Sequence, residues 1–75
     1  MEETLNEAIS RRLREEIEYS GKSKTEIAQA IGVSKSTISQ YLSGRAQPTL
    51  QTLSKLCTFL DCSADEILGV QSRIN

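Results

Sequence analysis

The sequence predicts a small all-α domain built from five helices. Apolar residues recur at spacings of three and four along most of the chain, which is the helical period. Ser or Thr stands directly before each apolar run, where it would act as a helix N-cap. All four glycines follow such runs, at positions where helices end. The predicted helices are Thr4–Tyr19, Lys24–Ile31, Lys35–Leu42, Leu50–Leu60 and Ala64–Leu68.

The first predicted helix opens with a capping box formed by Thr4 and Glu7. Its buried stripe is expected to consist of Leu5, Ile9, Leu13 and Ile17. The other faces carry both signs of charge, which is typical of a solvated surface with pairs three or four residues apart. Gly21 is expected to end this helix.

The stretch from Ser23 to Gly44 reads as two short helices joined by a tight turn. Ser23 and Glu26 form a second capping box, and Ser34 caps the next helix. Gly32 is expected to supply the left-handed residue of the turn. The apolar positions expected to face the core are Ile27, Ala28, Ile31, Val33, Ile38 and Leu42.

The last third of the chain predicts two more helices after Pro48, which disfavours helix at the residue before it. Thr49 is the expected N-cap, and Ser63 with Glu66 forms a third predicted capping box. Phe59 falls off the apolar stripe and is expected to be partly exposed, while Asp61 occupies a position where glycine is usual. The expected inward stripe is Leu50, Leu53, Leu56, Cys57 and Leu60.

Length and composition exclude several function classes. A chain of 75 residues allows one domain, taken as residues 1–75. No long apolar run predicts a signal peptide or a membrane span, so we expect a cytoplasmic protein. The chain has no histidine, phosphate-binding loop or nucleophile–base pair, so we expect no enzyme, metal, cofactor or small-molecule ligand. Cys57 and Cys62 are predicted to be buried free thiols, with a redox or metal role as the alternative.

The net charge of −1 conceals an uneven distribution. Residues 1–18 carry three basic and six acidic groups, and residues 61–75 carry one basic and three acidic groups. Residues 19–60 carry five basic groups against Glu26 alone. Because salt screens charges beyond about 10 Å, the local excess of positive charge governs attraction to phosphates.

The predicted helix Lys35–Leu42 has an unusual polar face without a carboxylate. Side chains that donate hydrogen bonds from such a face suit DNA phosphates and base edges. The candidate base-reading residues are Lys35, Ser36, Ser39 and Gln40, and the candidate phosphate contacts are Lys24, Thr37, Tyr41 and Arg45. An ordinary polar helix surface is the alternative, with Tyr41 packed in the core; Arg12 or Arg14 could also reach a phosphate.

The run I-A-Q-A-I-G-V-S-K-S-T-I-S-Q-Y-L-S-G, followed by Pro48 and D-C-S-A-D-E-I-L-G, resembles the phage-repressor/Cro-like helix-turn-helix family of the xenobiotic-response-element type. The resemblance covers about residues 13–69. It implies a five-helix, lambda-repressor-like DNA-binding domain whose third helix enters the major groove. Many members pair an arginine late in helix one with a glutamate late in helix three. Ile17 and Leu42 stand at the matching positions here, which predicts an apolar contact instead.

The leading hypothesis is therefore a sequence-specific DNA-binding regulator of transcription, and specifically a repressor, with double-stranded DNA as its partner. The alternatives are a protein-binding adaptor or antitoxin-like module on the same scaffold, or the excised DNA-binding domain of a longer regulator. We expect a homodimer on DNA, because small domains gain stability by pairing and such repressors read two-fold operators. The candidate dimer surface is Ile67, Leu68, Val70 and Ile74, with Phe59 beside them.

Overall fold

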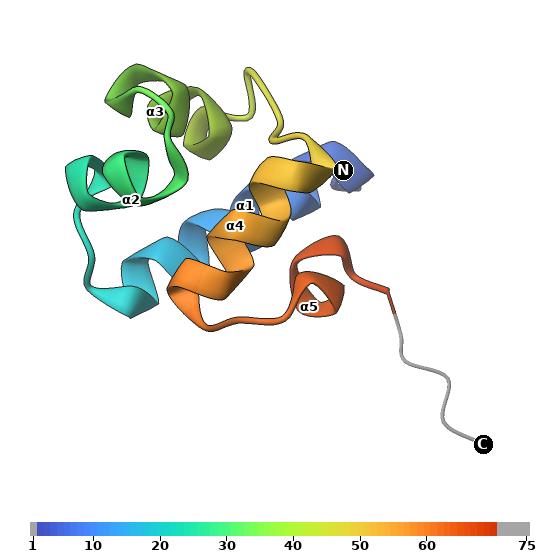
Figure 1. The fold of residues 1–75 in the computed structure, drawn as a ribbon. Helices are drawn as coiled ribbons and strands as arrows, with labels where there is room; N and C mark the ends of the chain where they lie inside the picture. The colour runs from blue at the N-terminus through green and yellow to red at the C-terminus, as the bar shows by residue number, and fades with distance from the viewer. Residues whose placement is uncertain (1, 71–75) are drawn as a thin grey trace.

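The computed structural model describes residues 2–70 and contains five helices and no strand within them. The helices are α1 (Leu5–Ser20), α2 (Lys24–Ile31), α3 (Lys35–Ser43), α4 (Leu50–Leu60) and α5 (Ala64–Leu68) (Figure 1). The all-α prediction is confirmed, and the bounds of α2, α4 and α5 are those predicted. Helix α1 is shifted by one residue because Thr4 is its N-cap, and α3 is one residue longer than expected.

Helix α1 is the central packing element. It contacts α3, α4 and α5, while α2 packs against both α3 and α4. In Figure 1, α2 and α3 form an angled pair on one side of the molecule, and α1 passes behind α4. This arrangement leaves the outer side of α3 free of other helices. None of the helices in residues 2–70 is long and apolar enough to cross a bilayer.

A single core holds the five helices together. Its most deeply buried large side chains come one from each helix: Leu13, Ile27, Ile38, Leu56 and Ile67. Burial of such a side chain contributes about 1.5–3 kcal/mol relative to leaving it exposed. Helix α3 contacts α1 and α2 directly, so its angle depends first on these two helices.

Two predicted core positions are wrong. Leu5 is 66% exposed and Leu50 is 82% exposed. Each is the first residue of its helix, and a helical side chain covers the turn N-terminal to its own Cα. These two side chains therefore extend past the last packed turn. Ala8 and Ser10 are buried on α1 instead.

Four of the five helix starts are capped as predicted. Thr4 with Glu7 and Ser23 with Glu26 form complete capping boxes, and Ser34 and Thr49 accept N-cap hydrogen bonds. The third predicted capping box is wrong, because Ser63 makes no side-chain cap hydrogen bond. Its ψ of 130° also differs from the 157–167° of the other four caps.

The helix ends agree with the sequence prediction. Gly32 has φ 78° and forms the turn between α2 and α3, and Asp61 adopts φ 55° after α4. At this second turn the Cys62 N–H donates to the Cys57 carbonyl at 3.0 Å, which is the Schellman pattern. Both thiols are free; Cys57 is buried and Cys62 is half-buried. Burial raises the pKa of Cys57 and raises that of Cys62 to about 12, so neither is a reactive thiolate.

Candidate nucleic-acid interface

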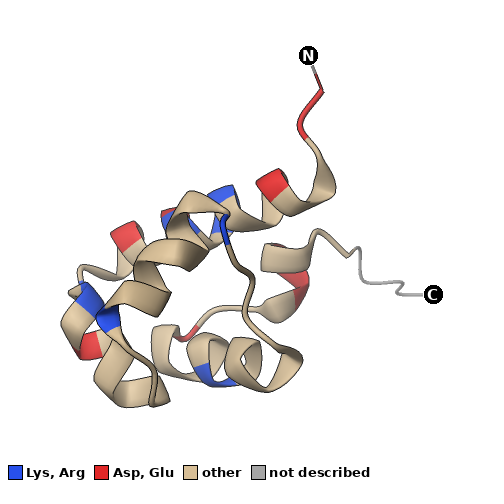
Figure 2. Ribbon diagram, turned by 90° about the horizontal axis from the view of Figure 1, so that it is seen from above, with Lys and Arg blue, Asp and Glu red and all other residues tan. Residues whose placement is uncertain are grey.

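Helix α3 separates its side chains into an inner and an outer face. Ile38 and Tyr41 are buried, and Lys35, Ser36 and Gln40 are exposed. The helix has no acidic residue, so its outer face is polar without being negative. Figure 2, which looks at the α3 side of the molecule, shows this helix without acidic colouring. Such a surface meets a polyanion without charge repulsion.

Most of the predicted reading residues come together on this face. Ser36, Ser39 and Gln40 line one shallow depression with Arg45, which follows the helix, and with Ser43. Three of the four candidate base readers thus lie beside one candidate phosphate contact; Lys35, which directly precedes Ser36 in the chain, does not line the depression. Ser43 was missed from the sequence, although its spacing of three from Gln40 already places it on the same helix face.

Lys24 lies closer to the reading face than its sequence position suggests. It is the first residue of α2, yet its Nζ lies 3.5 Å from the Ser39 Oγ of α3. The two side chains line a second depression between α1, α2 and α3, together with Lys22 and Ser43. The turn at Gly32 therefore places the lysine beside the candidate base readers.

Two other candidate phosphate contacts have structural partners. The Thr37 hydroxyl lies 2.9 Å from the Ser34 Oγ, which also accepts the Thr37 N–H as the N-cap of α3. Tyr41 is 7% exposed and belongs to the hydrophobic core. Its burial favours the core-packing alternative. Among the four candidates, Lys24 and Arg45 are the exposed cations.

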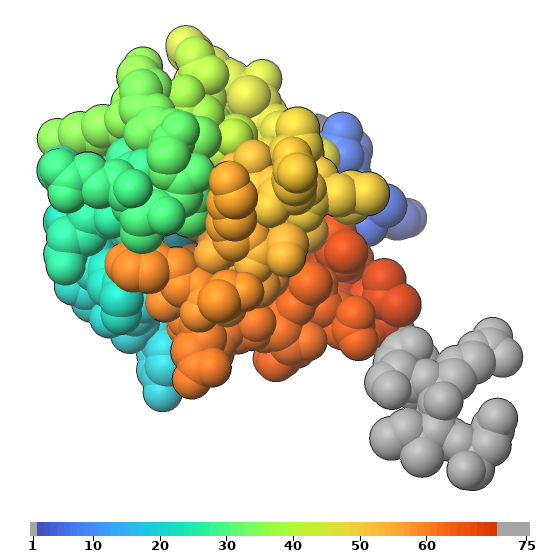
Figure 3. Space-filling model, in the orientation of Figure 1, coloured from blue at the N-terminus to red at the C-terminus, as the bar shows by residue number. Residues whose placement is uncertain are grey.

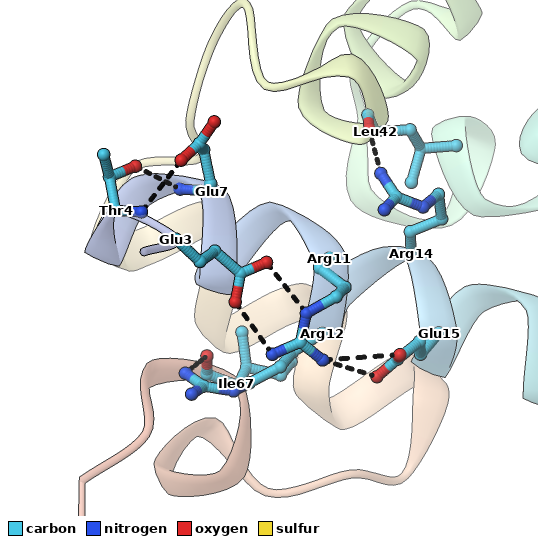
Figure 4. Close-up of polar contacts among 9 residues, drawn as sticks. All are labelled: Glu3, Thr4, Glu7, Arg11, Arg12, Arg14, Glu15, Leu42 and Ile67. Carbon is cyan, nitrogen blue, oxygen red and sulfur yellow. Dashed lines mark hydrogen bonds and ion pairs between the residues drawn. The ribbon is translucent and has the colours of Figure 1, made fainter. Parts of the chain in front are cut away.

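The arginines of α1 have three different environments (Figure 4). Arg11 forms an ion pair with Glu15 at 3.4 Å, at the predicted spacing of four residues. Its shorter ion pair, with Glu3 at 2.9 Å, spans eight residues and was not predicted. The hydrogen bond from Arg11 lowers the pKa of Glu3. Arg12 and Arg14 instead donate to main-chain carbonyls of α5 and α3, contacts that the sequence analysis did not predict.

The packing of Ile17 and Leu42 agrees with the predicted apolar contact, at the positions where many members of the resembled family carry an ion pair. Ile17 is buried in the core, and Leu42 is half-buried against it. Both side chains line the depression between α1 and α3. The interface between these helices is thus apolar where many members of the resembled family carry a salt bridge.

Comparison with known proteins places these observations in a family. A helix-turn-helix family model matches residues 11–67, which includes all of α2, α3 and α4. The chain belongs to this helix-turn-helix family. It is also 33% identical over 61 residues to the cryptic phage CTXphi transcriptional repressor RstR of Vibrio cholerae serotype O1. That alignment covers 81% of this chain and 54% of RstR, so the chain spans about half the length of its curated relative. No solved structure matches it significantly.

Proposed function

We propose that this helix-turn-helix protein is a sequence-specific DNA-binding repressor of transcription that acts in the cytoplasm. The observation that carries the proposal is the exposed, acid-free face of α3, where Ser36, Ser39 and Gln40 lie beside Arg45. The similarity to the repressor RstR supports repression of transcription over activation. The family also supports the expectation of a non-enzymatic regulator.

The proposed contacts divide into two kinds. Lys24 and Arg45 flank the reading face as exposed cations, and they would hold phosphates and fix the register of the domain on the duplex. Lys35 suits guanine O6 and N7, and Gln40 suits adenine N6 and N7 in the major groove. Ser36 and Ser39 have short hydroxyl side chains, which can donate a hydrogen bond to guanine or adenine or accept one from a base.

Two alanine variants test whether the base contacts and the phosphate contacts are made by different residues. Gln40→Ala should cost about 1–3 kcal/mol on the preferred site and relax the preference at one base position. Lys24→Ala should weaken binding to all sequences about equally and lower the salt slope by about one. The preferred site is first obtained by selection from random duplex DNA. Titrations on preferred and scrambled duplexes at several salt concentrations then measure both effects.

The control is Lys55→Ala, which removes an exposed cation from α4, outside the candidate interface. It should leave binding to both duplexes nearly unchanged. Equal weakening of preferred and scrambled DNA by Gln40→Ala would exclude base reading by that residue. If neither Gln40→Ala nor Lys24→Ala alters binding to DNA, the protein-binding adaptor becomes the leading hypothesis.

The proposal includes a homodimer, but the structure changes its candidate surface. Ile67 is 1% exposed and so offers no free apolar surface. Phe59 is half-buried, as predicted, with the Lys22 Nζ 5.3 Å from its ring centre. Ile74 lies outside the described residues. A groove between α4 and α5 is lined by Leu50 and Leu68 and widens the candidate surface to α4. In Figure 3 the surfaces of these two helices adjoin.

A further inference from the structure

Helix α1 supplies a charged donor to the C-terminal end of two other helices. Arg14 Nη1 donates to the Leu42 carbonyl of α3 at 2.9 Å. Arg12 Nη1 donates to the Ile67 carbonyl of α5 at 3.3 Å. Neither α3 nor α5 has a basic residue in its own last turn. The cations that complement these two helix dipoles therefore come from α1, and Figure 4 shows both contacts.

The Arg14 contact satisfies one further main-chain carbonyl at the end of α3. The last four carbonyls of a helix lack intrahelical partners. The Gln40 carbonyl accepts from the Arg45 and Ala46 N–H groups, and the Tyr41 carbonyl accepts from the Gly44 N–H. The Leu42 carbonyl, one position later, accepts from Arg14. The guanidinium therefore joins α1 to the turn of α3 that carries Gln40 and Ser43.

We propose that Arg14 is a positioning residue for the recognition helix, an inference that rests on the proposed function of α3. Its guanidinium fixes the C-terminal turn of α3 against α1 at residue 42, where an apolar side chain replaces the family's glutamate. The bond uses the main chain, so it is compatible with any side chain at that position. It orients the outer face of α3 while Arg14 itself touches neither base nor phosphate.

The first test uses the protein without DNA. In Arg14→Ala, NMR spectra should show a shifted Leu42 carbonyl carbon and faster exchange of the Gly44 and Arg45 amides. Arg11→Ala removes the same charge from the same exposed side of α1, but its partners are Glu3 and Glu15, so these signals should stay unchanged. Unchanged Leu42, Gly44 and Arg45 signals in Arg14→Ala would overturn the proposal.

The second test measures binding to the selected and scrambled duplexes, at a temperature where thermal unfolding shows both variants fully folded. A cation at a helix C-terminus contributes about 0.3–1 kcal/mol, which corresponds to about twofold to fivefold in an equilibrium constant. Relative to Arg11→Ala, the Arg14→Ala variant should therefore bind the preferred site about twofold to fivefold more weakly. The two variants should have the same affinity for scrambled DNA and the same dependence of binding on salt.

The outcomes separate the two levels of the proposal. Equal weakening on both duplexes with a salt slope lower by about one would make Arg14 a phosphate contact and overturn its positioning role. If the wild-type protein shows no preferred sequence, the proposed function fails. The NMR comparison would still decide whether Arg14 holds the end of α3.

Discussion

Asp61 is the one residue other than glycine with a positive φ among residues 2–70. It stands after α4, where the chain needs a left-handed residue, and it places a carboxylate near the negative end of the helix dipole. Aspartate tolerates this conformation better than most residues, but glycine adopts it without steric strain.

Asp61→Gly should therefore stabilise the domain. The gain from relieving the left-handed strain exceeds the entropic cost of glycine by roughly 0.5–1 kcal/mol. For a domain of this size, each kcal/mol corresponds to about 4–8 °C in Tm. Thermal unfolding followed by circular dichroism measures the shift. Asp61→Asn removes the charge and keeps a side chain of similar size. If Asp61→Asn raises the Tm as much as Asp61→Gly does, the gain comes from removing the carboxylate charge from the negative end of the α4 dipole.

At the residue scale, the sequence predicted most of the inward-facing positions, but it missed Ala8 and Ser10 on α1. It failed for Leu5 and Leu50 because periodicity does not show where the neighbouring helix stops. It also left Tyr41 between core and phosphate, since a ring with a hydroxyl suits both environments. Only the three-dimensional packing shows that this ring is buried.

At the element scale, the capping boxes show how local chemistry sets helix bounds. In α2 the Glu26 carboxylate accepts the Ser23 N–H at 3.0 Å, and the Ser23 hydroxyl accepts the Glu26 N–H at 3.1 Å. The hydrogen bond from the Ser23 backbone lowers the pKa of Glu26 below its usual value of 4.5. The stability of the N-terminal end of α2 therefore depends on pH.

The sign of that link follows from the lowered pKa. A carboxylate whose pKa is lower in the folded state stabilises the fold above its unfolded pKa. This stabilisation is lost as the pH falls through the lowered pKa of the folded state. Unfolding of wild type and Glu26→Gln in urea should differ at pH 7 and converge below pH 4.5, as the carboxylate becomes protonated.

Glu18→Gln is the matched control for that experiment, because it removes one α1 carboxylate that lies outside both capping boxes. It corrects for the change in net charge. A stability difference between wild type and Glu26→Gln that is constant from pH 7 down to strongly acidic pH would contradict the assigned role of the ionised carboxylate.

Contacts between elements could not be predicted in the same way. A capping box spans four residues and is visible in the sequence, as Thr4 and Glu7 show. The bonds from Arg12 and Arg14 join residues 55 and 28 positions apart and end on main-chain carbonyls, which have no side-chain signature. Lys24 and Ser39 lie in separate helices, so their proximity depends on the angle set by the Gly32 turn.

At the scale of the whole molecule, the candidate DNA-binding face and the candidate dimer groove lie on different helices. The reading side of α3 is polar and free of acidic residues, whereas the groove between α4 and α5 is lined by Leu53 and Leu68 together with polar residues such as Thr58 and Asp61. A dimer formed through it would leave both recognition helices available to successive major grooves, about 34 Å apart or a multiple of that distance.

Leu50 gives the sharpest test of this assembly. It is 82% exposed at one end of the groove, so Leu50→Lys should leave the fold intact while placing a charge in the proposed interface. Tyr19→Lys is the matched control, because Tyr19 is 90% exposed on α1 and lies outside the groove lining. Sedimentation velocity, without DNA and with duplexes carrying one or two half-sites, should show that only Leu50→Lys weakens pairing. A wild-type protein that stays monomeric in solution and on a two-half-site duplex would exclude the homodimer.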